Sequence, residues 1–234
     1  MIGRKGAFSH HPTTPSPYAP ISLMPLLQLA LDDLDLDTAC TLVTDLAALI
    51  DVVEAGTPLI KRYGMDAVRR LRQVAPRKLL VADMKTMDAG ALEANLAFDA
   101  GADIISVLGC AGNRTIQAAL EVAEKRQKSL AADLLGVADK PTRARQLAQM
   151  GVHYISVHTG SDDQKSGDTP LSDLADVRRA VDCAIMVAGG ITAQTIPGLL
   201  HHKPDVLIVG SAITKAPDPL TVTQQICNAI RQNQ

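Results

Sequence analysis

Residues 83–88 place two acidic residues and a lysine at a spacing that could serve catalysis. Asp83, Lys85 and Asp88 follow the pattern D-x-K-x-x-D. In an extended strand, side chains two positions apart point to the same face, so Asp83 and Lys85 would lie side by side. A carboxylate can bind a hard cation, and a fixed ammonium can stabilise negative charge that develops on a substrate. The pattern therefore indicates chemistry that passes through an anion, provided that the fold brings these residues to a pocket.

Four more polar residues lie at the ends of short, mainly apolar runs. They are Asp32, Glu54, Asp133 and His158. Taken alone, Asp32 could cap a helix, Asp133 could belong to a turn, and His158 could be an ordinary loop histidine. Helix caps and turns favour Asp, Asn, Ser or Thr, however, and do not require Glu, Lys and His together. The combination favours an active site.

Glycines follow the last two apolar runs. Residues 187–191 read VAGGI and residues 209–213 read VGSAI, which places Gly189, Gly190, Gly210 and Ser211 directly after these runs. Glycine lacks a Cβ atom, so backbone N–H groups in such loops can approach an anion closely. A tight turn would explain each glycine alone. Two such loops after neighbouring runs favour a phosphate-binding site.

The apolar runs recur as eight β-type segments separated by segments with helical period. They are Leu26–Leu31, Ile50–Glu54, Lys78–Asp83, Asp103–Leu108, Leu130–Leu134, Val152–His158, Ala184–Ala188 and Asp205–Val209. Alternating strands and helices are typical of a parallel sheet covered by helices, and eight such units close into a (β/α)8 TIM barrel. In that fold the C-terminal strand ends form the mouth of the active site. An open doubly wound sheet is the alternative, but residues 31–34 lack the glycines of a dinucleotide-binding turn.

The segments between the runs have the spacing of amphipathic helices. Residues 39–46 and 116–123 carry apolar side chains at positions i, i+3, i+4 and i+7. Asp37, Asn113 and Thr142 lie near the expected helix starts, where a short polar side chain could cap free N–H groups. We therefore expect helices to cover the strands.

The composition excludes several classes of function. The chain has 234 residues, with 23 Lys and Arg against 25 Asp and Glu, and 2% aromatic residues. It lacks the basic runs and stacking aromatics of a nucleic-acid-binding protein, and no apolar run reaches the ~20 residues that a membrane helix needs. The four cysteines stand far apart, which favours a reducing, cytoplasmic location. Residues 1–23 are rich in proline, so we expect a disordered N-terminal extension, or an over-long start, before a single barrel domain over residues 24–234.

Several segments resemble a known enzyme family. They are residues 54–60 (EAGTPLI), 82–90 (ADMKTMDAG), 107–109 (VLG) and 187–190 (VAGG). From about Leu26 to the C-terminus, the chain resembles the 3-hexulose-6-phosphate synthases, members of the orotidine-monophosphate-decarboxylase-like suprafamily of phosphate-binding barrels. Their nearest relatives are the 3-keto-L-gulonate-6-phosphate decarboxylases. The resemblance implies a (β/α)8 barrel of the ribulose-phosphate-binding type.

The resemblance also implies an activity. It is the reversible joining of formaldehyde to D-ribulose 5-phosphate to give D-arabino-hex-3-ulose 6-phosphate, an aldehyde-lyase reaction of the ribulose monophosphate pathway of formaldehyde assimilation. Glu54 and Asp83 would bind Mg²⁺, with Lys85 beside them. The cation would stabilise the enediolate that forms when the ketose loses its C1 proton. Lys85 would add a second fixed positive charge.

Other residues have implied or inferred roles around this centre. By resemblance, Asp32 contacts the substrate, and Asp88 reaches the neighbouring subunit's site across a homodimer. We also expect Asp133 to bind the substrate. His158 is our candidate for the base that removes the C1 proton, because imidazole titrates near physiological pH. The glycine loops would hold the phosphate group and so position the sugar.

Two alternatives remain open. A 3-keto-L-gulonate-6-phosphate decarboxylase would use the same enediolate chemistry. That family, however, carries arginine where this chain has Ser161 and Ser211, and glutamate where it has Asp133. These departures favour the synthase reaction. The second alternative is a non-catalytic barrel that binds a sugar phosphate, but such a protein would gain nothing from burying so many charges.

Overall fold

The computed structural model describes residues 24–164 and 169–233, and eight strands lie within these residues. The strands are β1 (Leu26–Leu31), β2 (Val52–Ala55), β3 (Leu79–Thr86), β4 (Ile104–Leu108), β5 (Ser129–Asp133), β6 (Tyr154–His158), β7 (Ala184–Ala188) and β8 (Val206–Val209). Each strand overlaps one of the apolar runs identified in the sequence. The extension expected over residues 1–23 lies outside the described residues.

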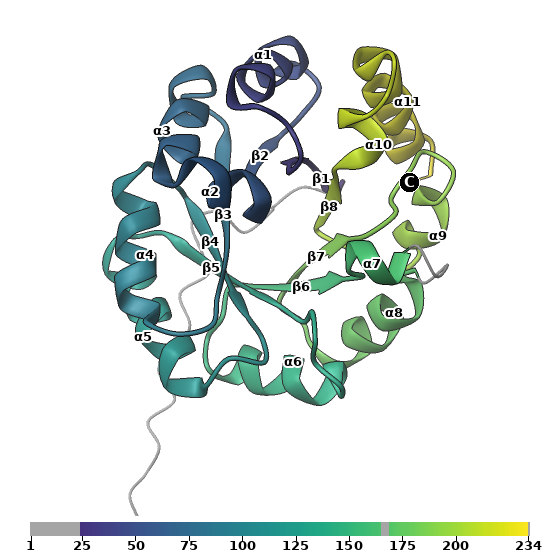
Figure 1. The fold of residues 1–234 in the computed structure, drawn as a ribbon. Coiled ribbons are helices and arrows are strands. Elements are labelled where there is room, and N and C mark those ends of the chain that lie inside the picture. The colour runs from purple at the N-terminus through teal and green to yellow at the C-terminus, as the bar shows by residue number, and fades with distance from the viewer. Residues whose placement is uncertain (1–23, 165–168, 234) are drawn as a thin grey trace, which may run out of the picture.

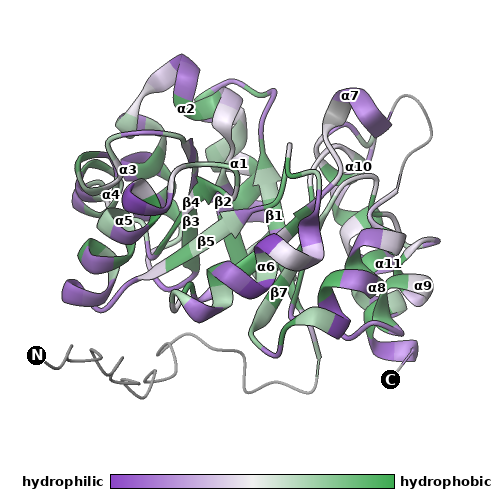
Figure 2. Ribbon diagram, turned by 90° about the horizontal axis from the view of Figure 1, so that it is seen from below, coloured by the Kyte–Doolittle hydropathy of each residue, from purple (hydrophilic) through white to green (hydrophobic). Residues whose placement is uncertain are grey.

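Eleven helices lie within the same ranges. They are α1 (Leu36–Leu46), α2 (Thr57–Tyr63), α3 (Met65–Val74), α4 (Gly90–Asp99), α5 (Asn113–Lys125), α6 (Lys140–Gln149), α7 (Ser161–Gln164), α8 (Leu171–Ala180), α9 (Ile196–Leu200), α10 (Ser211–Thr214) and α11 (Pro219–Gln232). Helices α2, α7 and α10 are short and directly follow β2, β6 and β8, and Figure 2 shows α2 and α7 at the same end of the molecule. Among these helices, none combines the length and the apolar character that a membrane-spanning segment needs.

The eight strands form a closed parallel barrel. Each strand pairs with the next one in sequence, and β8 pairs with β1, where Val206 lies opposite Leu26. Figure 1 looks along the barrel and shows the helices as a ring around the strands. The closed barrel confirms the predicted (β/α)8 fold and excludes the open doubly wound sheet.

The strands separate two apolar regions. Side chains that point outward, such as Leu29, Val53 and Ile105, pack against the helices in the main core. Side chains that point inward form a smaller cluster made of Val52, Val81, Ile104, Ala131, Tyr154, Met186 and Val206. Because side chains alternate along a strand, the inward position two residues after Val52 is Glu54, and two after Val81 is Asp83. The interior is therefore apolar at one level and polar towards the C-terminal strand ends.

Aspartates begin three of the helices, although not at the residues that the sequence suggested. Asp35, Asp139 and Asp218 are the N-caps of α1, α6 and α11, and each accepts the backbone N–H of the residue three positions later. Asp37, Asn113 and Thr142, which we expected as caps, lie inside the helices instead. The expectation was wrong by one to three residues, since apolar period locates a helix but not the residue at which it begins.

Candidate active site

A cavity of about 540 Å³ opens at the C-terminal ends of the strands, a size within the range of small-molecule sites. Ten residues singled out from the sequence line it: Asp32, Glu54, Asp83, Lys85, Asp133, His158, Gly189, Gly190, Gly210 and Ser211. They belong to seven of the eight strands or to the loops that follow them, and Ser106 on β4 completes the circle. The barrel thus brings together residues that lie far apart in the chain.

Lys85 lies between two carboxylates. Its Nζ atom is 2.7 Å from Oδ2 of Asp83 and 3.1 Å from Oδ2 of Asp133. Burial by itself would lower the pKa of the ammonium group, but the two carboxylates outweigh burial and raise the pKa above its ordinary value. Lys85 is therefore a fixed positive charge in the wall of the cavity.

The backbone at Lys85 departs from regular strand geometry. Its φ angle is +46°, and the pairing of β3 with β4 shifts between Ala82 and Thr86. The N–H of Lys85 donates to Oγ of Ser106 at 2.9 Å, and the Ser106 hydroxyl donates to Oδ1 of Asp83 at 2.6 Å. A non-glycine residue in this conformation costs on the order of 1 kcal/mol or more, so its surroundings must hold it. Ser106 supplies one such restraint on both Lys85 and Asp83.

Three side chains donate to the carboxylate of Asp83. Ser106 donates to Oδ1, while Lys85 and Thr57 donate to Oδ2. Thr57 is the first residue of α2, and its hydroxyl also lies 2.7 Å from the backbone oxygen of Asp83. A carboxylate offers about four lone pairs, so about one, on Oδ1, is left for a further partner.

Asp133 connects Lys85 to His158. Its Oδ2 atom is 3.0 Å from Nδ1 of His158, and its Oδ1 accepts the N–H of Leu135 at 2.9 Å. Burial raises the pKa of Asp133, but the hydrogen bond and charge of His158, together with Lys85, lower it below its ordinary value. The carboxylate is therefore ionised near neutral pH. Its predicted contact with substrate stays a prediction, because both oxygens already meet protein donors.

Three carboxyl groups of the cavity, those of Asp32, Glu54 and Asp83, interact with one another. Burial, followed by the charges of Asp83 and Asp32, raises the pKa of Glu54 to about 8. Burial, followed by the charge of Asp83, also raises the pKa of Asp32. Gln28 donates its amide to Oε2 of Glu54, and in the described part of the chain Oε1 of Gln28 is buried without a hydrogen-bond partner. The three carboxyl groups thus repel one another when ionised, and nearby positive charge does not fully offset this repulsion.

This donor set fits a Mg²⁺ ion. Among residues 24–164 and 169–233, no group of three or more His, Cys, Asp or Glu side chains is arranged to hold a metal. Mg²⁺ does not need such a group, because it usually binds one or two carboxylates and keeps several waters or substrate oxygens. Glu54 and Asp83 offer two carboxylates with open lone pairs, and the raised pKa of Glu54 indicates a place where a cation would be stabilising.

The glycine loops require glycine for their shape. Gly189 and Gly190 have φ angles of +115° and +63°, which side chains with a Cβ rarely adopt. A Cβ on Gly189 would also lie 2.8 Å from the backbone oxygen of Thr159. Gly210 is the N-cap of α10, and Ser211 is its first residue. These four residues line the cavity without contributing a cationic side chain.

Asp88 is separate from this group. It is exposed and does not line the cavity, and its Oδ1 atom accepts the N–H of Ala89 at 2.7 Å. Its expected contribution to a neighbouring subunit's site stays a prediction, as does the homodimer.

Several polar residues of the cavity were missed in the sequence. Gln28 and Ser106 interrupt apolar strands and lie on the inward face, which is a signal that could have found them. Thr57 and Lys61 belong to α2. The alternation of side chains along a strand does not indicate how this helix lies over the mouth of the barrel. Their positions emerge only from the folded barrel.

The fold and the cavity define a (β/α)8 barrel with an ionisable site at the C-terminal strand ends. The family model described as Orotidine 5'-phosphate decarboxylase / HUMPS family matches residues 25–226. The chain belongs to this family.

Individual members of the family are similar over nearly the whole chain. The 3-hexulose-6-phosphate synthase of Bacillus subtilis (strain 168) is 40% identical over 207 residues, which are 88% of this chain and 99% of that protein. The crystal structure of 3-hexulose-6-phosphate synthase from Salmonella typhimurium has a TM-score of 0.87 at 39% identity, over 89% of this chain and 100% of that one. The crystal structure of 3-keto-L-gulonate-6-phosphate decarboxylase from Vibrio cholerae has a TM-score of 0.79 at 29% identity. The match covers 90% of this chain and 99% of that one. The resemblance expected from the sequence is confirmed.

Proposed function

We propose that this chain is an enzyme that catalyses the reversible aldol condensation of formaldehyde with D-ribulose 5-phosphate to D-arabino-hex-3-ulose 6-phosphate. The similar proteins from Bacillus subtilis and Salmonella typhimurium are 3-hexulose-6-phosphate synthases. The observation that carries the proposal is the position of Lys85, held at the cavity by Asp83 and Asp133. A fixed cation at this point suits a reaction that creates an anion.

The first step is removal of the C1 proton of the ketose by His158. Asp133 is ionised and lies 3.0 Å from Nδ1 of His158, so the proton of the neutral imidazole belongs on Nδ1. Nε2 then carries the free lone pair and can accept the proton. Asp133 stabilises the imidazolium that results, so the pair acts as one unit.

The second step joins the two substrates. Loss of the C1 proton leaves an enediolate, and the ammonium of Lys85 offsets its negative charge. Because Asp83 and Asp133 hold this ammonium in place and charged, no reorganisation is needed as the anion forms. The C1 carbon then forms a bond to the carbon of formaldehyde, and the new alkoxide takes up the proton that His158 removed, so that no net proton is consumed.

Glu54 and Asp83 are the proposed ligands of Mg²⁺. When bound, the cation supplies Lewis-acid stabilisation of negative charge on the substrate oxygens. Asp32 lines the same cavity and is available to accept hydrogen bonds from sugar hydroxyls. We also propose that the chain works as a homodimer to which Asp88 contributes across the interface; this part of the proposal rests on family resemblance.

The loops after β7 and β8 are the proposed phosphate site. Gly189, Gly190, Gly210 and Ser211 line the cavity at the strand ends, where barrels of this kind bind phosphate with backbone N–H groups. Holding the phosphate there fixes the depth at which C1 meets the catalytic groups. Positioning of this kind contributes a large part of the rate in reactions between two substrates.

A single assay tests the proposal. Purified protein is incubated with D-ribulose 5-phosphate, formaldehyde and Mg²⁺, and formaldehyde consumption is followed with and without a chelator. We expect consumption that the chelator abolishes. Release of CO₂ from 3-keto-L-gulonate 6-phosphate without consumption of formaldehyde would assign the decarboxylase reaction instead. Binding of the sugar phosphate without either reaction would indicate a non-catalytic barrel.

A further inference from the structure

The charges that line the cavity do not balance a phosphorylated substrate. Five carboxylates (Asp32, Asp33, Glu54, Asp83 and Asp133) and three lysines (Lys61, Lys85 and Lys215) line it, with no arginine among the described residues. A phosphate monoester brings a further charge of about −1.5 to −2 at pH 7. The glycine loops contain no cationic side chain, so any positive charge that faces the phosphate besides their backbone N–H groups comes from elsewhere in the cavity.

Two of the three lysines are already paired. Lys85 meets Asp83 and Asp133 at 2.7 and 3.1 Å. Lys215 follows α10 and its Nζ atom lies 3.8 Å from Oδ2 of Asp33. Lys85 is therefore balanced by two buried carboxylates, and Lys215 faces the exposed carboxylate of Asp33 before a substrate arrives.

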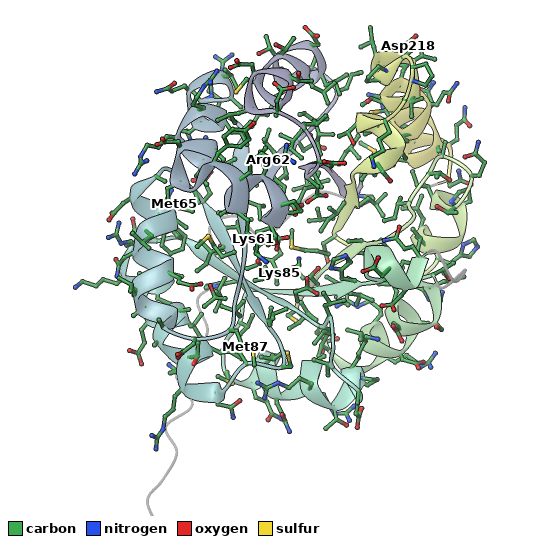
Figure 3. All side chains as sticks on the ribbon, in the orientation of Figure 1. Lys61, Arg62, Met65, Lys85, Met87 and Asp218 are labelled. Carbon is green, nitrogen blue, oxygen red and sulfur yellow. The ribbon has the colours of Figure 1, made fainter. Side chains whose placement is uncertain are left out.

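Lys61 has no such partner. It lies in the last turn of α2, is exposed, and lines the cavity. Within residues 24–164 and 169–233 its side chain makes no hydrogen bond or ion pair, whereas the neighbouring Arg62 pairs with Asp33 and with the backbone of Leu34. Figure 3 shows Lys61 and Lys85 towards the centre of the barrel mouth, and Asp218 at the periphery.

We propose that Lys61 binds the phosphate group of the substrate. The inference rests on the proposed function, because it takes a sugar phosphate as the ligand. Lys61 lies on a helix beyond the strand ends, as the phosphate loops do, while Asp83, Lys85 and Asp133 form part of the strands themselves. An ammonium on a flexible four-carbon stem can reach a charged group without a fixed geometry. Lys61 thus complements the neutral loops at the outer end of the substrate.

Binding measurements with three variants test this role. The variants are Lys61→Ala, Lys61→Arg and, as a matched control, Lys125→Ala. Lys125 is also an exposed lysine in the last turn of a helix, but it does not line the cavity. Binding of D-ribulose 5-phosphate and of inorganic phosphate is measured by titration calorimetry at low ionic strength, in the presence of Mg²⁺. Kinetic constants are measured where turnover is found.

For Lys61→Ala we expect the Kd for D-ribulose 5-phosphate to rise at least fivefold. Lys61→Arg should restore binding to within threefold, and Lys125→Ala should leave it unchanged. A rise in this Kd of less than fivefold for Lys61→Ala would overturn the proposal, and so would a fall in kcat with unchanged KM. Failure of the unmodified protein to bind either probe would also overturn it. Binding without turnover would refute the proposed reaction only, because the comparison of Kd values still decides the role of Lys61.

Discussion

The Nδ1 atom of His158 lies 3.0 Å from Oδ2 of Asp133, at the carboxyl ends of two adjacent strands, β6 and β5. The backbone N–H of Leu135 and the ammonium of Lys85 occupy the other positions around the carboxylate. An ionised, buried carboxylate in this position fixes both the orientation and the tautomer of the ring. It also links the proposed base to the fixed cation, so the two parts of the chemistry share one anchor.

Replacing the base should stop proton exchange. For His158→Asn we expect exchange of the C1 proton of D-ribulose 5-phosphate with D₂O to fall by about 10²–10⁴-fold, the usual contribution of a positioned base. Proton NMR measures this exchange without formaldehyde. His201→Asn is the control, because His201 is exposed and does not line the cavity. Exchange that persists in His158→Asn would mean that another group is the base.

Removing the fixed cation should affect turnover more than folding. Lys85→Ala should lower kcat by about 10²–10³-fold or more, since Lys85 acts where negative charge develops. The far-UV circular dichroism spectrum should be retained. Lys125→Ala is again the matched control. Activity within tenfold of the unmodified protein would contradict the electrostatic role of Lys85.

Ser106 should behave as a positioning residue. Ser106→Ala removes the acceptor for the N–H of Lys85 and a donor to Asp83. We expect kcat to fall by about 10–100-fold, as for other groups that orient metal ligands and their neighbours, with little change in KM for the sugar phosphate. Unfolding by urea should show a loss of about 1–3 kcal/mol, because partners are left unsatisfied. Ser156→Ala should lower the free energy of unfolding by less, since no hydrogen bond of the Ser156 hydroxyl is found within the described residues. Equal losses of unfolding free energy in the two variants would argue against the role of the Ser106 hydrogen bonds.

The raised pKa of Glu54 predicts how pH affects the metal-free protein. Because the folded-state pKa of about 8 exceeds the ordinary value of 4.5, the folded protein holds an extra proton between these pH values. The free energy of unfolding should therefore decrease as pH rises from about 5 to about 8. Thermal unfolding in the presence of a chelator measures this slope. Glu54→Gln should flatten it, and a slope that is unchanged in this variant would contradict the assignment.

The same carboxylate predicts the pH dependence of cation binding. Mg²⁺ must displace the proton of Glu54, so its affinity should increase as pH rises towards 8. Titration calorimetry without substrate measures the affinity and the protons released. Binding that does not change between pH 6 and 8 would show that Glu54 is not a ligand, or that it is already ionised.

Much of the fold and part of the site could be predicted from the sequence. The strands were found because they are apolar and buried on both faces, and period two then placed Asp83 and Lys85 side by side. The contacts of Ser106 with Lys85 and Asp83 could not be predicted, since these residues are more than 20 positions apart in the chain. Nor does the sequence indicate that Lys85 has a positive φ angle, because this conformation depends on the irregular pairing of β3 with β4.

The pairing of β8 with β1 closes the barrel, and a bound sugar phosphate should stabilise this closure. The carboxylates Asp32, Glu54 and Asp83 come from the first three strands, whereas the glycine loops come from the last two. Across the seam where the sheet closes, a Cβ on Gly210 would be 3.6 Å from Oδ2 of Asp32. A sugar phosphate that contacts both the carboxylates and the glycine loops would link the strands on the two sides of this closure. Its arrival should therefore slow local opening of the barrel at the N–H of Leu26, which donates to the backbone oxygen of Asp205 at 2.9 Å.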